Sequence, residues 1–153
     1  PQYKIKDIKK TLLYINWFGR NQLLQNNPKI IFDVAHNESG ILSFIQNIIN
    51  ENKKYHKRYL LLSLQKHKKI KNIINDIHTT FDEVIYSQTN HEKSMQFSQV
   101  KEFLPKAIYI KNPKNSIAYI LNKSKKNKFI GIIGTHCWGR AIQETFNISF
   151  DNL

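Results

Sequence analysis

The sequence has very little cysteine and no long apolar run. Cys137 is the one cysteine in 153 residues, which excludes an internal disulfide framework and a cysteine-rich zinc site and fits a reducing compartment. No stretch reaches the roughly 18 apolar residues of a membrane span, and no apolar signal segment opens the chain. We therefore expect a soluble, cytoplasmic protein without a membrane partner. Because the chain opens on Pro1 rather than Met, we also expect it to be part of a longer polypeptide.

Acidic residues and arginine are also scarce. The chain has 11 Asp and Glu against 24 Lys and Arg, for a formal charge of +13, and its arginines are Arg20, Arg58 and Arg140. Such a charge suits phosphate backbones. The lysines, however, are scattered beside abundant Asn and Ile, as AT-rich coding would produce, and they lack the interleaved aromatics on which single-stranded bases stack. The composition does not favour nucleic acid as a partner, although a basic binding module stays an alternative.

Short apolar runs alternate with segments of helical spacing. Five runs have the length of buried strands, at residues 29–35, 58–64, 83–88, 107–111 and 128–134. The segments that follow them predict amphipathic helices, at 39–52, 68–81, 94–104, 115–126 and 140–146. This alternation indicates an α/β fold, a Rossmann-like open, mainly parallel sheet with helices on both faces. The length fits one domain spanning residues 1–153.

Polar residues follow the first of these strands in "IIFDVAHNES". Asp33, His36 and Asn37 stand where the strand gives way to a helix that starts near Ser39. In an open parallel sheet this is the edge where ligands bind. The alternative is structural, with Asn37 or Ser39 capping the helix and Asp33 serving the turn.

The last strand also ends in polar residues, in "FIGIIGTHCWGRA". The glycine spacing is close to that of a phosphate-binding P-loop, but Arg140 and Ala141 stand where Lys and a hydroxyl residue are required. We therefore exclude a triphosphate loop. Gly134 and Thr135 are better interpreted as a tight strand exit whose backbone and hydroxyl face a ligand, or as a plain turn.

A third candidate is "NWFGRNQLL", residues 16–24. Arg20 follows two aromatic residues and Gly19 at the boundary of a segment. In a chain with so few arginines, this one is a candidate fork for phosphate or carboxylate, with a solvated surface charge as the alternative.

The three segments, in this order, resemble the C-terminal domain of the Mur ligase superfamily, most closely that of folylpolyglutamate synthase and dihydrofolate synthase. That family has W-P-G-R-x-[EQ], then a short strand, then D-[GV]-A-H-N-P, and a G-S turn near the end. Here the same order is "WFGRNQ", "DVAHNE" and "GTHCWG". The resemblance spans about residues 12–147, and the first two motifs together carry it.

The resemblance implies a role for each matching residue. Arg20 corresponds to the arginine that reaches the ATP phosphates from the C-terminal domain. Asp33, His36 and Asn37 match the motif that lines the interdomain cleft and contacts the nucleotide and the incoming glutamate. Thr135 matches a serine associated with the amino-acid site. These matches imply catalytic roles for Arg20 and His36 and substrate binding by His36 and Thr135. They also imply nucleotide binding by Arg20, Asp33, His36 and Asn37.

Lys68, in "SLQKHKKI", is the third catalytic residue that the resemblance implies. It falls where the family often has a D-K-D triplet, with His67 and Lys69 in place of both carboxylates. Phe18 and Glu38 also depart from the family, because each replaces a proline. These departures bear on the exact substrate more than on the fold.

The implied activity is that of an ATP-dependent acid–amino-acid ligase. In that chemistry a pterin or folate carboxylate attacks the γ-phosphate of ATP, and the amino group of L-glutamate then attacks the resulting acyl phosphate. The triphosphate loop and most Mg²⁺ ligands belong to a central domain that this sequence lacks, so no metal ligand is assigned here. We expect the chain alone to be inactive, to work with an N-terminal ATPase domain of the same polypeptide, and to use residues 1–11 as a linker. Alternatives are a stand-alone basic binding module with this fold, or the domain of another Mur-type ligase.

Overall fold

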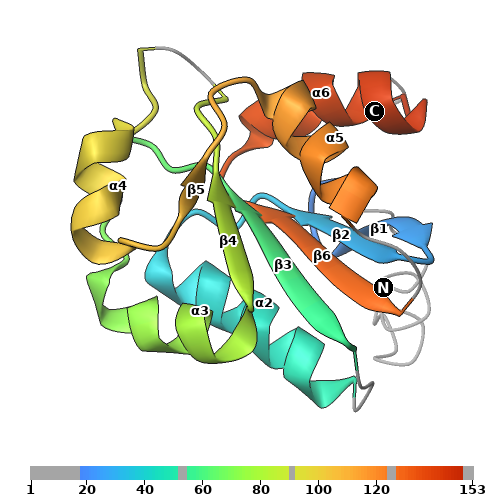
Figure 1. Cartoon of the computed structure of the whole chain (residues 1–153), viewed down its shortest axis with the longest axis horizontal. Helices are drawn as coiled ribbons and strands as arrows, with labels where there is room; N and C mark the ends of the chain where they lie inside the picture. Colours follow the sequence, from blue (N-terminus) through green and yellow to red (C-terminus); the bar gives the residue numbers. More distant parts are fainter. Residues whose placement is uncertain (1–17, 52–54, 90–91, 124–126, 150–153) are drawn as a thin grey trace, which may run out of the picture.

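A six-stranded sheet forms the centre of the computed structural model, which describes residues 18–51, 55–89, 92–123 and 127–149. In chain order the strands are β1 (Gln22–Asn26), β2 (Lys29–Asp33), β3 (Lys57–Leu62), β4 (Glu83–Tyr86), β5 (Ile108–Tyr109) and β6 (Lys128–Ile133). The order across the sheet is β1-β2-β6-β3-β4-β5, with β1 antiparallel to β2 and the other pairs parallel (Figure 1). The predicted fold class is confirmed.

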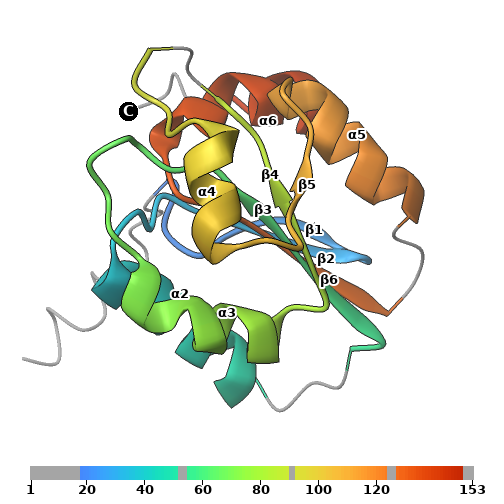
Figure 2. The same ribbon diagram turned by 60° about the vertical axis from the view of Figure 1, so that its left-hand side comes forward.

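Helices cover both faces of the sheet. In chain order they are α2 (Glu38–Asn50), η1 (Lys71–Ile73), α3 (Ile74–Thr80), α4 (Phe97–Phe103), α5 (Pro113–Lys123), η2 (His136–Trp138) and α6 (Gly139–Phe146). Helices α2 and α3 lie on one face, and α5 and α6 lie on the opposite face (Figures 1 and 2). Helix α4 lies beside the β4–β5 edge (Figure 2).

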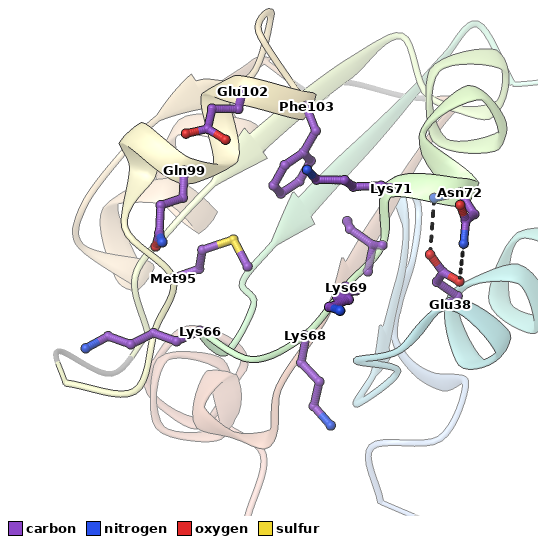
Figure 3. A pocket seen from close by; sticks show the side chains of 11 residues that line it. Glu38, Lys66, Lys68, Lys69, Lys71, Asn72, Met95, Gln99, Glu102 and Phe103 are labelled. Carbon is purple, nitrogen blue, oxygen red and sulfur yellow. Dashed lines mark hydrogen bonds between the residues drawn. The ribbon is translucent and has the colours of Figure 1, made fainter.

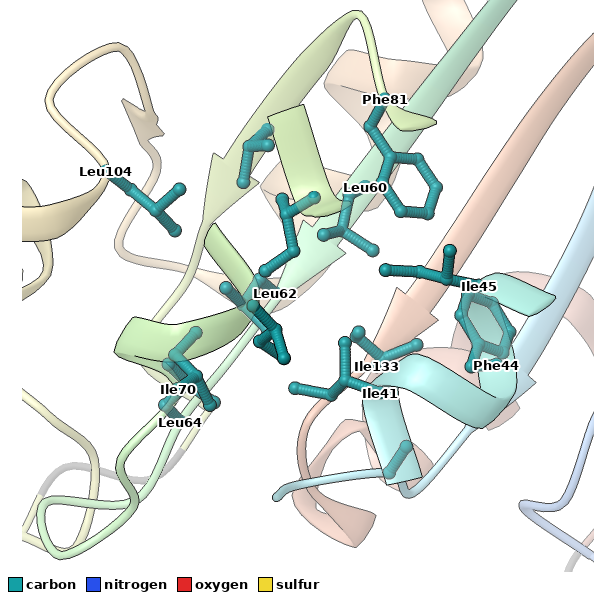
Figure 4. Close-up of a cluster of buried hydrophobic side chains, with 14 of the residues drawn as sticks. Ile41, Phe44, Ile45, Leu60, Leu62, Leu64, Ile70, Phe81, Leu104 and Ile133 are labelled. Atoms are coloured by element: carbon teal, nitrogen blue, oxygen red, sulfur yellow. The ribbon is translucent and has the colours of Figure 1, made fainter. Parts of the chain in front are cut away.

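Two apolar clusters, one on each face, hold the layers together. Alternate residues of β3 serve the two sides, so that Leu60 and Leu62 pack under α2 and α3 while Leu61 packs under α5 and α6. Figure 4 shows the first cluster, where Ile41 and Phe44 of α2 meet the strands. Each fully buried side chain of this size contributes about 1.5 to 3 kcal/mol through the area it removes from water. Burial on both faces explains the nearly unbroken apolar runs of the central strands.

The boundaries differ from the prediction in a few places. All five predicted strands run one or two residues past the observed ends, which are Asp33, Leu62, Tyr86, Tyr109 and Ile133. The predicted helix 68–81 begins only at Lys71, as a single 3₁₀ turn that leads into α3. Strand β1 was not predicted by periodicity, and only the family resemblance indicated a short strand there.

Part of the prediction lies outside the described residues. The linker assigned to residues 1–11 and the tryptophan of the "WFGRNQ" segment, Trp17, are both in that part of the chain. Within the described residues, no helix is long and apolar enough to cross a membrane. The cytoplasmic location stays a prediction.

Candidate functional site

The topology creates a crevice where β2 and β6 end. The two strands are parallel neighbours, and their last residues, Asp33 and Ile133, are paired in register. The chain leaves β2 into α2 on one face and leaves β6 into η2 and α6 on the other (Figure 1). Adjacent strands whose chains turn to opposite faces define the switch point at which open α/β sheets bind ligands. Both predicted motifs lie at this point.

Asp33 is 5% exposed and joins the end of β2 to the turn before β1. Its Oδ1 accepts a hydrogen bond from the Ala35 backbone N–H at 2.7 Å, and its Oδ2 accepts one from the Asn21 backbone N–H at 2.8 Å. The guanidinium of Arg20 lies 3.6 Å from Oδ1, with its side chain 53% exposed. The structural role considered for Asp33 is therefore confirmed. Through this ion pair Asp33 helps to position an arginine whose side chain stays half-exposed.

Gly19 fixes the turn that carries Arg20. Its φ of +71° is left-handed, and a Cβ there would lie 2.8 Å from Cγ1 of Val34. Its carbonyl oxygen accepts a hydrogen bond from the Val34 backbone N–H at 2.8 Å, and its own N–H donates to Oε1 of Gln22 at 2.9 Å. The Gly-Arg pair is thus bound to the exit of β2 by backbone contacts on both sides.

His36 is half-buried in the loop between β2 and α2. Its Nδ1 lies 2.9 Å from the carbonyl oxygen of Val34. A carbonyl oxygen only accepts, so Nδ1 carries the proton and Nε2 of the neutral ring is left as an acceptor. The imidazole is therefore oriented by the backbone and keeps one nitrogen for another partner.

Asn37 is the N-cap of α2, which begins at Glu38. Its Oδ1 accepts hydrogen bonds from the Gly40 backbone N–H at 2.8 Å and from the Ser39 hydroxyl at 3.1 Å. The capping role considered for this residue is confirmed. Its nucleotide contact stays a prediction.

Gly134 and Thr135 form the tight exit from β6 that the sequence predicts. Gly134 has a φ of +109°, and a Cβ there would lie only 1.8 Å from the carbonyl oxygen of Ser63, at the end of β3. Thr135 is buried, and its Oγ1 accepts a hydrogen bond from the Cys137 backbone N–H at 3.2 Å. Thr135 also borders a cavity of about 90 Å³, which lies beside the ends of β3 and β6.

Lys68 stands apart from the Arg20–Asp33 pair. It lies in the loop after β3 and borders a cavity of about 470 Å³ between that loop and α4 (Figure 3). The structure thus brings together Arg20, Asp33 and His36, places Thr135 on the neighbouring strand exit, and puts Lys68 on the wall of a separate cavity.

Two contacts at the site involve residues to which the sequence assigned no role. The backbone N–H of Asn21 binds Asp33, and the carboxylate of Glu38 accepts hydrogen bonds from the backbone and side-chain amides of Asn72, both at 3.1 Å. The second contact joins the start of α2 to η1. Neither contact has a signal in the local sequence, because each depends on how distant segments meet.

Charged groups near α6 are paired with each other. Arg140 donates from Nε to Glu144 at 3.0 Å, and Lys114 of α5 donates to the same carboxylate at 3.2 Å. These hydrogen bonds, that from Arg140 first, hold the pKa of Glu144 below its usual value. Among the described residues no group of three or more His, Cys, Asp or Glu is placed to hold a metal ion.

Comparisons with known proteins give the class of this fold. The chain is 24% identical over 136 residues to the dihydrofolate synthase/folylpolyglutamate synthase of Buchnera aphidicola, covering 88% of this chain and 32% of that protein. The folylpolyglutamate synthase of Mycobacterium tuberculosis superposes with a TM-score of 0.80 at 16% identity, over 97% of this chain and 36% of that one. The bifunctional synthase of Yersinia pestis superposes with a TM-score of 0.83 at 15% identity and the same coverage. No protein-family model matches the chain.

These findings show that the chain shares its fold with part of the folylpolyglutamate and dihydrofolate synthases. The predicted resemblance to these synthases is confirmed. The chain spans about a third of the length of the relatives that it matches.

Proposed function

We propose that this chain is the glutamate-side, C-terminal domain of an ATP-dependent folylpolyglutamate/dihydrofolate synthase. In this proposal its partner is the ATPase domain of the same polypeptide, and the product is an amide between L-glutamate and a folate or pterin carboxylate. The similarity to synthases over most of the chain supports it. A related solved synthase has manganese, AMPPNP and L-glutamate bound, which are the kinds of ligand that the proposed reaction requires.

The observation that carries the proposal is the placement of Arg20. Its guanidinium is half-exposed at the switch point of the sheet, on a turn that Gly19 and Asp33 fix from both sides. A preorganised arginine stabilises the charge that develops on a phosphoryl group in transfer, because it needs no rearrangement at the moment of reaction. The pairing with Asp33 keeps the guanidinium in place and leaves about half of the side chain exposed to meet a phosphate.

The other site residues fit the second half-reaction. His36 offers Nε2 as an acceptor close to the same crevice, where it can receive a hydrogen bond from the amino group of glutamate. Thr135 positions the turn after β6 and borders the neighbouring cavity. ATP supplies the phosphoryl group when it is bound. Mg²⁺ would be held mainly by the ATPase domain, since the described residues offer no ligand set for it.

Substitution of Arg20 and His36 tests the proposal in the full-length ligase, or with the ATPase domain supplied in trans. We expect Arg20→Ala and His36→Ala each to lower kcat by about 10²-fold or more, because each removes a group that acts in a transition state. The melting temperature should change little, because the Arg20 side chain is exposed and the His36 side chain is half-buried in a loop. Glutamate ligation and thermal unfolding are measured on the same preparations.

His78 provides the control. It lies exposed on α3 and contacts none of the site residues named above, so His78→Ala should leave ligation intact. Near-normal ligation by the Arg20 and His36 variants would overturn the site, as would a loss of activity that only follows unfolding. A protein that binds ligands but forms no amide even with the ATPase domain present would be the stand-alone binding module.

A further inference from the structure

A lysine-lined cavity lies next to the proposed glutamate site. It has a volume of about 470 Å³, within the range of about 300 to 1,000 Å³ that small-molecule sites occupy. The loop after β3 and the start of η1 form one side, and α4 with Met95, two residues before it, forms the other (Figure 3). The lining side chains that matter are Lys66, Lys68, Lys69, Lys71, Met95 and Phe103.

The lysines of this cavity have no counter-ion among the described residues. Elsewhere three lysines are paired with carboxylates, those of the pairs Lys29–Glu51, Lys114–Glu144 and Lys123–Glu83. Here two carboxylates border the cavity. That of Glu38 uses both oxygens for Asn72, while Glu102 has no ion pair within the described part of the chain. Four lysines within six positions of the chain therefore leave a local excess of positive charge, which an anionic ligand would neutralise.

The cavity also has an apolar floor. Ile70 is 1% exposed and Met95 is 7% exposed, and Phe103 of α4 adds an aromatic ring to the lining (Figure 3). Cations around an apolar surface suit a ligand in which carboxylates alternate with methylene groups. A compact polyphosphate is better held by arginine forks and converging backbone N–H groups, and no arginine lines this cavity.

The cavity neighbours the smaller cavity at Thr135. Gln65 and Ser94 line the smaller cavity, and the next residues along the chain, Lys66 and Met95, line the larger one. We therefore expect a long, flexible ligand to span the two cavities. We propose that the larger cavity binds the oligo-γ-glutamyl tail of the acceptor, a polycarboxylate; this inference rests on the proposed function.

Equilibrium binding to the 153-residue chain tests the proposal without requiring ligation. The probes are γ-linked pentaglutamate, free L-glutamate and inorganic tripolyphosphate, followed by calorimetry. We expect pentaglutamate to bind best. Lys69→Gln/Lys71→Gln should weaken its binding about five- to thirtyfold, because each exposed ion pair contributes about 0.5 to 1 kcal/mol. Lys69→Arg/Lys71→Arg should restore it.

Variants that remove the same charge elsewhere distinguish a specific binding site from a general attraction between a basic protein and an anionic ligand. Lys57 and Lys106 are exposed and lie outside the cavity lining, so Lys57→Gln/Lys106→Gln should leave pentaglutamate binding within about twofold. Equal losses in both Gln double variants would overturn the proposal, as would tighter binding of tripolyphosphate that pentaglutamate fails to displace. This experiment measures binding, whereas the Arg20 and His36 variants are tested by ligation. A negative result in either experiment therefore leaves the other one interpretable.

Discussion

Gly134 shows how a single residue sets the distance between two strand exits. Its backbone is left-handed, and the carbonyl oxygen of Ser63 occupies the space that a side chain would need. We expect Gly134→Ala to lower the free energy of unfolding by about 3 kcal/mol or more, from backbone strain and from the displacement of Ser63 together. Urea denaturation measures this difference.

Gly139 is the matched control for that substitution. Its φ of −47° is helical, so alanine fits its backbone at the junction of η2 and α6. Gly139→Ala should change the free energy of unfolding by less than about 1 kcal/mol. An equally mild effect at Gly134 would show that the exits of β3 and β6 move apart readily.

The candidate residues could be found from the sequence, but their partners could not. Asp33, His36 and Asn37 follow a predicted strand, and the order of strands and helices places such residues at the ligand edge. The bond from Asn21 to Asp33 and the approach of Gly134 to Ser63 join segments that are 12 and 71 positions apart. Those contacts depend on strand order and register, and no local pattern encodes either.

The start of α2 depends on the Asn37 cap. The first N–H groups of a helix lack partners within it, and Oδ1 of Asn37 accepts from the Gly40 backbone N–H at 2.8 Å. We expect Asn37→Ala to cost about 1 kcal/mol and Asn37→Asp to keep most of the stability, since a carboxylate caps as well as an amide. Thermal unfolding of the chain is the measurement.

Ser39→Ala is the control for this cap. The Ser39 hydroxyl donates to Asn37 but satisfies no backbone group of the helix, so its loss should cost less than about 0.5 kcal/mol. If Asn37→Ala proved as mild, α2 would owe its start to packing alone.

Elements that pack on two apolar faces were the easiest to predict. The runs around β3 and β6 are buried on both sides, and the isoleucines of α2 repeat at helical spacing. Periodicity did not predict strand β1, because it is an edge strand whose residues are exposed or half-buried without a regular alternation. The first turn predicted for the helix at 68–81 is not helical in the structure. Its residues Lys68 and Lys69 lie in the loop on the cavity wall instead.

The whole molecule carries a formal charge of +13, which should make its stability depend on salt. Raising the ionic strength from about 0.01 M to about 0.1 M shortens the Debye length from about 30 Å to about 10 Å and screens the repulsion among the lysines. We expect the melting temperature to rise by about 2 to 4 °C for each kcal/mol that this screening adds to the free energy of unfolding. Calorimetric scans at several NaCl concentrations measure the rise.

The cavity lysines should account for part of that dependence. Lys69→Gln/Lys71→Gln removes two of the four clustered charges, so the rise should be smaller in this variant. A melting temperature that falls with salt would instead show that attractive ion pairs outweigh the repulsion.

The contact between Gly134 and Ser63 gives the two proposed ligand sites a common wall. One loop continues to Thr135 and the other to the cavity lysines, and the Ser63 N–H donates to the Ile133 carbonyl at 3.1 Å just before they meet. If glutamate and the polycarboxylate tail both order this wall, linkage requires each to strengthen the binding of the other by the same factor. Under the proposed function, a bound tail would then raise the affinity for the next glutamate, and a bound glutamate would hold the tail more tightly.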